Sequence, residues 1–195
     1  GTTEPGALIG IISKAAEARL TMRQIRKALD AGDIPSEMIE AISAHRWTEQ
    51  FEALRMRTEE YKTRTKDNVK VFLANMGPIP QHKSRADFST GFFEVGAFEV
   101  LKNDGFETTA DAAQAARDSG ADVVVICSTD ATYPELVPPL AKEIKETMPH
   151  ATVILAGAPP KDLEPTYREA GVDDFISVRA NCYAILNALQ DKKGM

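Results

Sequence analysis

Residues Val69–Phe88, VKVFLANMGPIPQHKSRADF, decide how the fold of this chain is interpreted. The apolar run Val69–Ala74 predicts a buried strand, and the loop expected after it contains two prolines and His82. In an open sheet of parallel strands, ligands bind beyond the carboxyl ends of the strands, which is where this loop would lie. The first question about function is therefore whether His82 is a metal ligand.

From Asn68 onward the sequence alternates between strand and helix patterns. Five strands alternating with five helices predict a parallel sheet covered by helices on both faces. The most apolar strands, 122–127 and 69–74, belong at the centre, which gives the order 2-1-3-4-5 of a flavodoxin-like (Rossmann-like) fold. Strands are expected at 69–74, 98–101, 122–127, 152–156 and 174–176, and helices at 86–95, 110–119, 133–148, 163–170 and 182–190, with Thr109 and Asn181 as caps.

The first 66 residues contain helical patterns only. Their apolar residues recur at helical spacing, but large apolar side chains are too few to close a core alone. We therefore expect a helical linker or appendage at 1–66, which packs on something else, and an α/β domain at 67–195. Thr21 is expected to cap a helix that ends at Gly32, and another helix is expected to begin at Pro35-Ser36.

Composition excludes several classes of partner. The net charge of −6 and the pI of about 5.2 argue against nucleic acid, whose binding needs clustered Lys and Arg. No run of about 18 apolar residues is present, so no membrane span is expected. Cys127 and Cys182 lack CxxC spacing, which fits free thiols in a reducing cytoplasm. Because the chain opens Gly1-Thr2-Thr3 without a methionine, we expect it to be part of a longer protein.

Two common uses of such a sheet can be tested on the loops after the strands. A flavin mononucleotide site needs backbone N–H groups after the first strand, but Pro78 and Pro80 have none. A phosphoacceptor receiver domain needs a carboxylate pair, an aspartate and a lysine after strands one, three and five. The matching positions are Ala74-Asn75, Cys127-Ser128 and Ser177-Val178-Arg179, so the magnesium ligands are missing.

Five segments of the α/β part occur in the order found in one known family. They are Leu73–Gly77, Asp122–Cys127, Leu136–Leu140, Val153–Pro160 and Glu169–Val172. Together they resemble the C-terminal cobalamin-binding domain of methylmalonyl-CoA mutases, over about residues 68–190. The stretch Trp47–Arg55, WTEQFEALR, is similar to the linker that joins the family's substrate barrel to this domain.

The resemblance implies where a cobalt site would lie. In the family, a D-x-H-x-x-G motif after the first strand supplies a histidine ligand, an aspartate that orients it, and a glycine that allows close approach. The matching positions of this chain are Ile79, Gln81 and Ser84, so all three residue types are replaced. His82 lies one residue late, and Pro80 stands where its supporting carboxylate would be needed.

The rest of the family's cofactor pocket is also altered. Ala156-Gly157 keeps small residues after strand four, but we expect Val178 and Arg179 to fill the space that a nucleotide tail needs. We expect Ser128 and Thr129 to cap the following helix. His82 is expected to be an exposed loop residue. The residues that remain for a bound corrinoid are His82, Ser128, Thr129 and Gly157.

The resemblance implies that this chain is the C-terminal part of the small subunit of a heterodimeric mutase. The leading interpretation is a non-catalytic structural domain that binds no cofactor or metal and supports the large subunit. The parent enzyme would be an isomerase, an intramolecular transferase that interconverts methylmalonyl-CoA and succinyl-CoA with adenosylcobalamin. The alternative is a functional corrinoid-binding module with His82 as a displaced cobalt ligand. A small-molecule site at Ser128–Thr132 is a third interpretation that no residue favours.

Other reactive or apolar side chains are interpreted as structural. Cys127 ends a buried strand without a nearby base, so packing is expected. His45 and His150 lack partners at ligand spacing and are expected on the surface. The run Lys83-Ser84-Arg85 is expected to be a solvated helix start. The segment Trp47–Leu54, with Phe51, contributes either to the core or to a partner contact, and an isolated fragment with this surface can form a homodimer.

Overall fold

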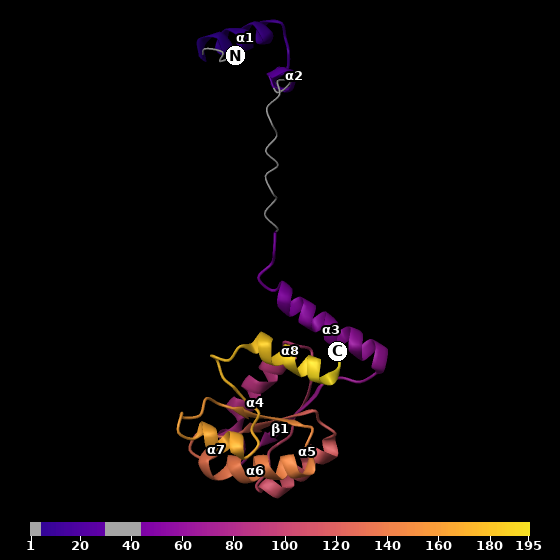
Figure 1. The fold of residues 1–195 in the computed structure, drawn as a ribbon, viewed down its shortest axis with the longest axis vertical. Helices are drawn as coiled ribbons and strands as arrows, with labels where there is room; N and C mark the ends of the chain where they lie inside the picture. The colour runs from indigo at the N-terminus through magenta and orange to yellow at the C-terminus, as the bar shows by residue number, and fades with distance from the viewer. Residues whose placement is uncertain (1–4, 30–43) are drawn as a thin grey trace. The chain divides into compact units, whose positions relative to one another are not determined.

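The computed structural model describes residues 5–29 and 44–195, and the chain divides into two compact units, residues 1–44 and 45–195 (Figure 1). The described part of the first unit contains α1 (Pro5–Glu17) and α2 (Met22–Leu29). The helix end expected at Gly32 and the start expected at Pro35-Ser36 lie outside the described residues. None of the described helices is long and apolar enough to span a membrane.

Thr21 caps α2, as predicted. Its Oγ1 accepts a hydrogen bond from the backbone N–H of Gln24 at 3.3 Å, and Gln24 Oε1 accepts from the backbone N–H of Thr21 at 2.8 Å. This reciprocal arrangement is a capping box, which satisfies two N–H groups at the helix start. In the described part of this unit Ile25 is the buried hydrophobic residue, in keeping with its shortage of core material.

A five-stranded parallel sheet forms the centre of the second unit, in the predicted order β2-β1-β3-β4-β5. Strands β3 and β4 are buried along their whole length, because helices cover both faces of the sheet. The strands are β1 (Lys70–Asn75), β2 (Glu99–Leu101), β3 (Val123–Cys127), β4 (Thr152–Ala156) and β5 (Asp174–Ile176).

Helices form one layer on each side of the sheet, and each layer encloses its own core. In Figure 1, α4 and α8 lie above the strands, whereas α5, α6 and α7 lie below them. Their bounds are α4 (Ile79–Glu94), α5 (Thr109–Ser119), α6 (Tyr133–Thr147), α7 (Glu164–Glu169) and α8 (Cys182–Lys193).

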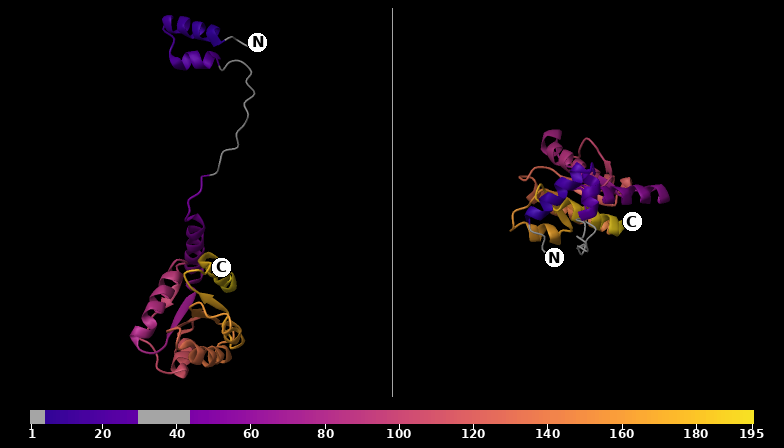
Figure 2. Two further views of the ribbon diagram at one scale, coloured as in Figure 1. Left: turned by 90° about the vertical axis from the view of Figure 1, so that its left-hand side faces the viewer. Right: turned by 90° about the horizontal axis from the view of Figure 1, so that it is seen from above.

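Helix α3 (Glu49–Thr65) packs on the outer side of α8 (Figures 1 and 2). The buried Gln190 of α8 donates from Nε2 to Leu54 O and to Thr58 Oγ1, both at 2.7 Å. Thr58 in turn donates to Gly96 O at 2.6 Å, in the turn between α4 and β2. These contacts attach α3 to the α/β unit, and the domain boundary after residue 66 stays a prediction.

The start of α4 and the cap of α5 differ from the prediction. Helix α4 begins at Ile79 rather than at residue 86, because Pro78 is its N-cap and Pro80 occupies its first turn, where a missing N–H costs nothing. Helix α5 is capped by Thr108 rather than Thr109, since Thr108 Oγ1 accepts from the Asp111 backbone N–H at 3.1 Å. The expected cap of α8 is confirmed: Asn181 Oδ1 accepts from the Ala184 N–H at 3.0 Å.

Candidate functional site

His82 lies near the start of α4 and is 3% exposed, so the prediction of an exposed loop histidine was wrong. The reason is the early start of α4, which turns this side chain inward. Its Nδ1 lies 3.0 Å from Gly77 O, and a carbonyl only accepts, so Nδ1 carries the donated proton. Gly105 covers the ring: a Cβ built there would lie 2.7 Å from His82 Cε1.

The cavity beside His82 has a volume of about 160 Å³ and lies between β1, α4 and the segment that follows β2. Its walls include Asn75 and Asn103, and Asn75 Nδ2 lies 3.2 Å from Asn103 Oδ1. None of the other three candidates, Ser128, Thr129 and Gly157, lines this cavity. His82 is therefore directed toward the β2 edge of the sheet.

A second hollow, of about 410 Å³, is the crevice expected beyond the carboxyl ends of the strands. Across it, Arg85 Nη2 of α4 lies 2.8 Å from Asp130 Oδ1 of the loop after β3. The pair lies above Gly157, where an added Cβ would be 3.6 Å from Asp130 Oδ1 and 3.8 Å from Arg85 Nη1. The crevice is lined by Ser84, Arg85, Phe88, Asp130, Ala158, Ser177 and Val178.

The loop after β5 does not close this crevice. Val178 is 89% exposed and Arg179 is also exposed, so the prediction that they fill interior space was wrong. The short strand β5 ends at Ile176, and Ser177 and Val178 after it line the crevice. The ion pair between Arg85 and Asp130 forms part of the crevice wall.

Ser128 and Thr129 are engaged in the turn that leads into α6. Ser128 is 1% exposed, and its Oγ donates to Met76 O at 3.2 Å. Thr132 Oγ1 lies 2.9 Å from both Ser128 Oγ and Thr129 O. The cap expected from Ser128 or Thr129 does not form: α6 has Thr132 at its N-cap, without a side-chain cap hydrogen bond.

Tyr133 is a residue of this region that sequence reasoning missed. Its hydroxyl donates to Ala156 O at 2.8 Å and accepts from the Ser128 N–H at 3.1 Å, so it joins the ends of β3 and β4. Burial raises the pKa of Tyr133 well above its usual value, which keeps the hydroxyl protonated as a donor. Nothing local in the sequence signals this role, because the hydrogen bond to Ala156 joins residues on different elements.

Cys127 is fully buried at the end of β3, and burial raises its pKa to about 12. Its Sγ lies 3.6 Å from Ser89 Oγ. A thiol in this state is neither nucleophile nor ligand at neutral pH, so a packing role is indicated. Across the described ranges, no group of three or more His, Cys, Asp or Glu side chains is placed to hold a metal ion.

The remaining candidates lie at the surface or within α3. His45 and His150 are exposed, as expected, although His45 Nδ1 lies 2.8 Å from Glu49 Oε2. Trp47 is 99% exposed, whereas Leu54 is buried. Phe51 packs edge to face on Tyr183 of α8, with ring centroids 5.8 Å apart. Leu54 thus belongs to the core of the α/β unit, whereas Phe51 packs at its margin on the partly buried Tyr183.

Comparison with curated proteins finds methylmalonyl-CoA mutase small subunits and, in Caenorhabditis elegans, a probable mitochondrial methylmalonyl-CoA mutase. Over 159 residues the chain is 31% identical to the methylmalonyl-CoA mutase small subunit of Porphyromonas gingivalis, which covers 80% of this chain and 24% of the relative. This chain is a homologue of methylmalonyl-CoA mutase small subunits. The small subunit of Streptomyces virginiae is 29% identical over 147 residues, covering 75% of this chain and 22% of the relative. The chain spans about a quarter of the length of these small subunits.

Solved structures agree on the fold. A cobalamin-binding protein from Desulfitobacterium hafniense matches with a TM-score of 0.51 at 13% identity, over 97% of this chain and 92% of that protein. A CheY-like protein from Pseudomonas aeruginosa also reaches a TM-score of 0.51, at 17% identity, over 66% of this chain and 96% of its own. These likenesses confirm the flavodoxin-like fold of the small-subunit homologue and carry no information on its ligands. No model of a protein family matches the chain.

Proposed function

We propose that this chain is a structural part of the small subunit of an adenosylcobalamin-dependent methylmalonyl-CoA mutase. Its α/β domain would be the C-terminal part of that subunit and would bind no cobalamin itself. A large subunit would carry the cofactor and interconvert methylmalonyl-CoA and succinyl-CoA. Homology to small subunits supports the assignment to this enzyme, and the position of His82 supports the absence of a cobalt ligand.

A histidine that ligates a metal must present one ring nitrogen to it, while a hydrogen-bond partner holds the other. His82 has such a partner in Gly77 O. However, its ring is buried below Gly105 and lines the cavity beside β2, not the crevice over the other strands. The residues of this loop therefore do not fit the cobalt of a bound corrinoid.

The residue at the family's ligand position supports the same proposal. Gln81 folds back over Gly77, so that its amide would overlap any Cβ added to that glycine. Ile79, at the position of the family's aspartate, is 53% exposed and has no group that can hold an imidazole. The Arg85–Asp130 pair lines the crevice, so a ligand that entered it would lie against this ion pair rather than against His82.

Titration of the purified chain with cobalamin, followed by visible absorption, tests the cofactor part of the proposal. We expect no saturable change at micromolar corrinoid, either in the wild type or in His82→Ala. His150→Ala is the matched control, since it removes an exposed histidine. A histidine-ligated spectrum that disappears in His82→Ala but persists in His150→Ala would overturn the proposal and establish the corrinoid-binding alternative.

A test of the assignment to the small subunit requires the full-length protein. We expect the complete small subunit to co-purify with the large subunit of the same organism, with cobalamin and mutase activity retained in the complex. The same complex carrying His82→Ala in the small subunit should bind as much cobalamin as the wild type. Failure of the two full-length subunits to associate would contradict the structural role.

A further inference from the structure

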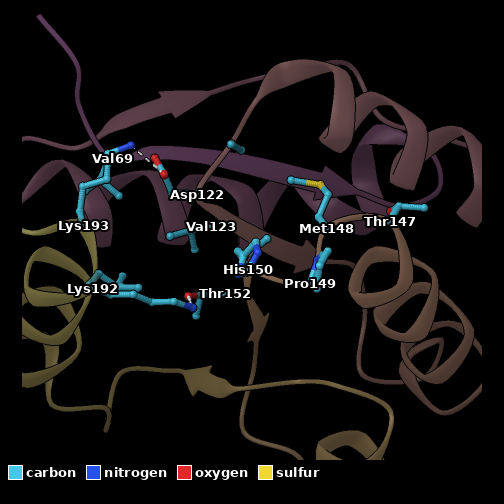
Figure 3. A pocket seen from close by; sticks show the side chains of 13 residues that line it. Val69, Asp122, Val123, Thr147, Met148, Pro149, His150, Thr152, Lys192 and Lys193 are labelled. Atoms are coloured by element: carbon cyan, nitrogen blue, oxygen red, sulfur yellow. Dashed lines mark hydrogen bonds and ion pairs between the residues drawn. The ribbon is translucent and has the colours of Figure 1, made fainter.

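A larger cavity, of about 490 Å³, lies at the amino ends of the strands, where β1, β3 and β4 begin. The crevice and the cavity beside His82 lie at the opposite, carboxyl ends. The last turn of α8 and the segment 147–150, at the end of α6, complete the walls of the larger cavity (Figure 3). Cavities of about 300–1,000 Å³ accommodate small organic molecules. Neither the crevice residues Arg85 and Asp130 nor His82 take part in it.

One lysine of this cavity, Lys193, already has two carboxylate partners. Lys193 Nζ lies 2.8 Å from Asp122 Oδ1 and 2.9 Å from Asp67 Oδ2, and its side chain is 18% exposed. The other oxygen of Asp122, Oδ2, accepts from the backbone N–H of Lys70 at 3.0 Å. Both oxygens of Asp122 and the ammonium of Lys193 are thus engaged, so this cluster is structural.

Lys192 differs from its neighbour. It extends from α8 to Thr152 (Figure 3), and within the described ranges its Nζ has one hydrogen bond, to Thr152 Oγ1 at 2.8 Å. An ammonium group has three N–H donors, so two remain for another acceptor. Unlike Lys193, it has no carboxylate partner in the part of the chain that the structure describes.

The hydroxyl of Thr152 adds a further donor. Thr152 is 8% exposed, and its Oγ1 already accepts from Lys192. Among the residues described, no acceptor is found for the hydroxyl hydrogen, so the hydroxyl can still donate. His150, exposed in the same wall, likewise has no hydrogen-bond partner among the described side chains. In either neutral tautomer its ring offers one N–H.

Unused donors therefore meet here, while the carboxylate in the cavity has no free oxygen. We propose that this cavity binds a small organic anion, a carboxylate or a phosphate monoester, through Lys192, Thr152 and His150. Its apolar body would pack on the hydrophobic part of the wall, which consists of Val69, Met148, Pro149 and Leu189. The C-terminal ends of α6 and α8 carry partial negative charge, which opposes an anion, so we expect modest affinity.

Phenyl phosphate is a suitable probe because it combines a phosphate with an apolar ring. Titration followed by amide NMR spectra should give saturable shifts at His150 and Thr152. Removal of the charge in Lys192→Gln should weaken binding about tenfold, as should removal of the hydroxyl in Thr152→Val. Thr152→Ser keeps the hydroxyl and should bind as the wild type does. Lys62→Gln removes an exposed lysine of α3 and should leave binding unchanged.

Three related probes identify which part of the molecule is recognised. Benzoate should compete with phenyl phosphate, inorganic phosphate should bind more weakly, and benzyl alcohol, which has no charge, should not bind at the concentrations used. Binding of benzyl alcohol as tight as that of phenyl phosphate would overturn the proposal. So would equal affinity of the wild type and a folded Lys192→Gln, or shifts confined to Arg85 and its neighbours. The result of this titration does not depend on corrinoid binding, because a corrinoid would bind at the carboxyl ends of the strands.

Discussion

The imidazole of His82 packs directly against the backbone of Gly105, leaving no room for a side chain there. A Cβ on Gly105 would lie 2.7 Å from His82 Cε1 and 3.0 Å from Gly77 O, and the φ of Gly105 is +106°. This arrangement allows His82 to be buried and still donate to Gly77 O. It makes Gly105 a structural requirement for the loop at the end of β1.

Gly105→Ala is expected to lower the free energy of unfolding by about 2 kcal/mol or more, from backbone strain and overlap with His82 together. Gly120→Ala is a matched control. Gly120 also has positive φ, +63°, but no atom lies within 4 Å of an added Cβ, so only the strain of about 1 kcal/mol remains. Urea unfolding followed by circular dichroism measures the stability of both variants. Equal losses of unfolding free energy would contradict a close contact between Gly105 and His82.

Gly91 provides a prediction of opposite sign. It lies inside α4, is exposed, and has open space where a Cβ would be added. Because alanine loses less backbone entropy on helix formation than glycine, Gly91→Ala should raise the free energy of unfolding by about 0.5–1 kcal/mol. A loss of stability in the same urea experiment would show that another group contacts this face of α4.

Cys127 should be inert in the folded protein. With its pKa raised to about 12 by burial, about one molecule in 10⁴ carries the thiolate at pH 8. The pKa of the half-buried Cys182 is also raised by burial. In Cys182→Ser, the remaining thiol should react with Ellman's reagent only as fast as the protein opens, and at once in denaturant. Rapid reaction of this variant without denaturant would contradict burial of Cys127.

The Lys193 cluster should make stability depend on pH at both extremes. Burial alone would lower the pKa of Lys193, but hydrogen bonds to Asp122 and Asp67 outweigh it and raise the pKa above 10.5. The hydrogen bond from Lys193 in turn lowers the pKa of Asp67 below 3.8. The stabilisation is therefore fully present between these values, and is lost as pH falls below 3.8 or rises beyond 10.5.

Lys193→Met tests this cluster. At pH 7 it should lower the free energy of unfolding by about 2 kcal/mol, because Asp122 loses a charged hydrogen-bond donor. Asp67 is more exposed than Asp122, so Asp67→Asn should lower the free energy of unfolding by less than about 1 kcal/mol. The difference between the wild type and Lys193→Met should shrink at pH 3 and at pH 11. A difference that stays constant across this range would exclude the ionic contribution.

Two buried polar residues that attach α3 should respond unequally to mutation. Thr58 Oγ1 accepts from Gln190 and donates to Gly96 O, so Thr58→Val leaves one N–H of Gln190 and the Gly96 carbonyl without these partners and should lower the free energy of unfolding by about 2 kcal/mol. Gln190 Oε1 already lacks a partner among the described residues. Because Gln190→Leu also removes this unpaired oxygen, it should lower the free energy of unfolding by less than about 1 kcal/mol. Urea unfolding that ranks the two variants in the reverse order would contradict this account.

The strand pattern was largely readable from local sequence. The apolar stretch at β3 (Val123–Cys127) and the bounds of β4 (Thr152–Ala156) and β5 (Asp174–Ile176) could be predicted, because β-branched runs covered on both faces are distinctive. The strand order followed from which strands are most apolar. In contrast, the start of α4 was missed, because Pro78 and Pro80 are as compatible with a loop as with the first turn of a helix.

The sequence by itself thus determined the five-stranded parallel sheet, whereas the replaced ligand motif at Ile79, Gln81 and Ser84 stays what the family resemblance implies. These depend on residue type and on periodicity along one element. Only the tertiary structure decided that His82 is buried under Gly105, that Arg85 crosses the crevice to Asp130, and that Lys192 lies beside Thr152 with no carboxylate partner among the described residues. Such contacts join residues from different elements, and they form only when helices pack against the sheet in one geometry.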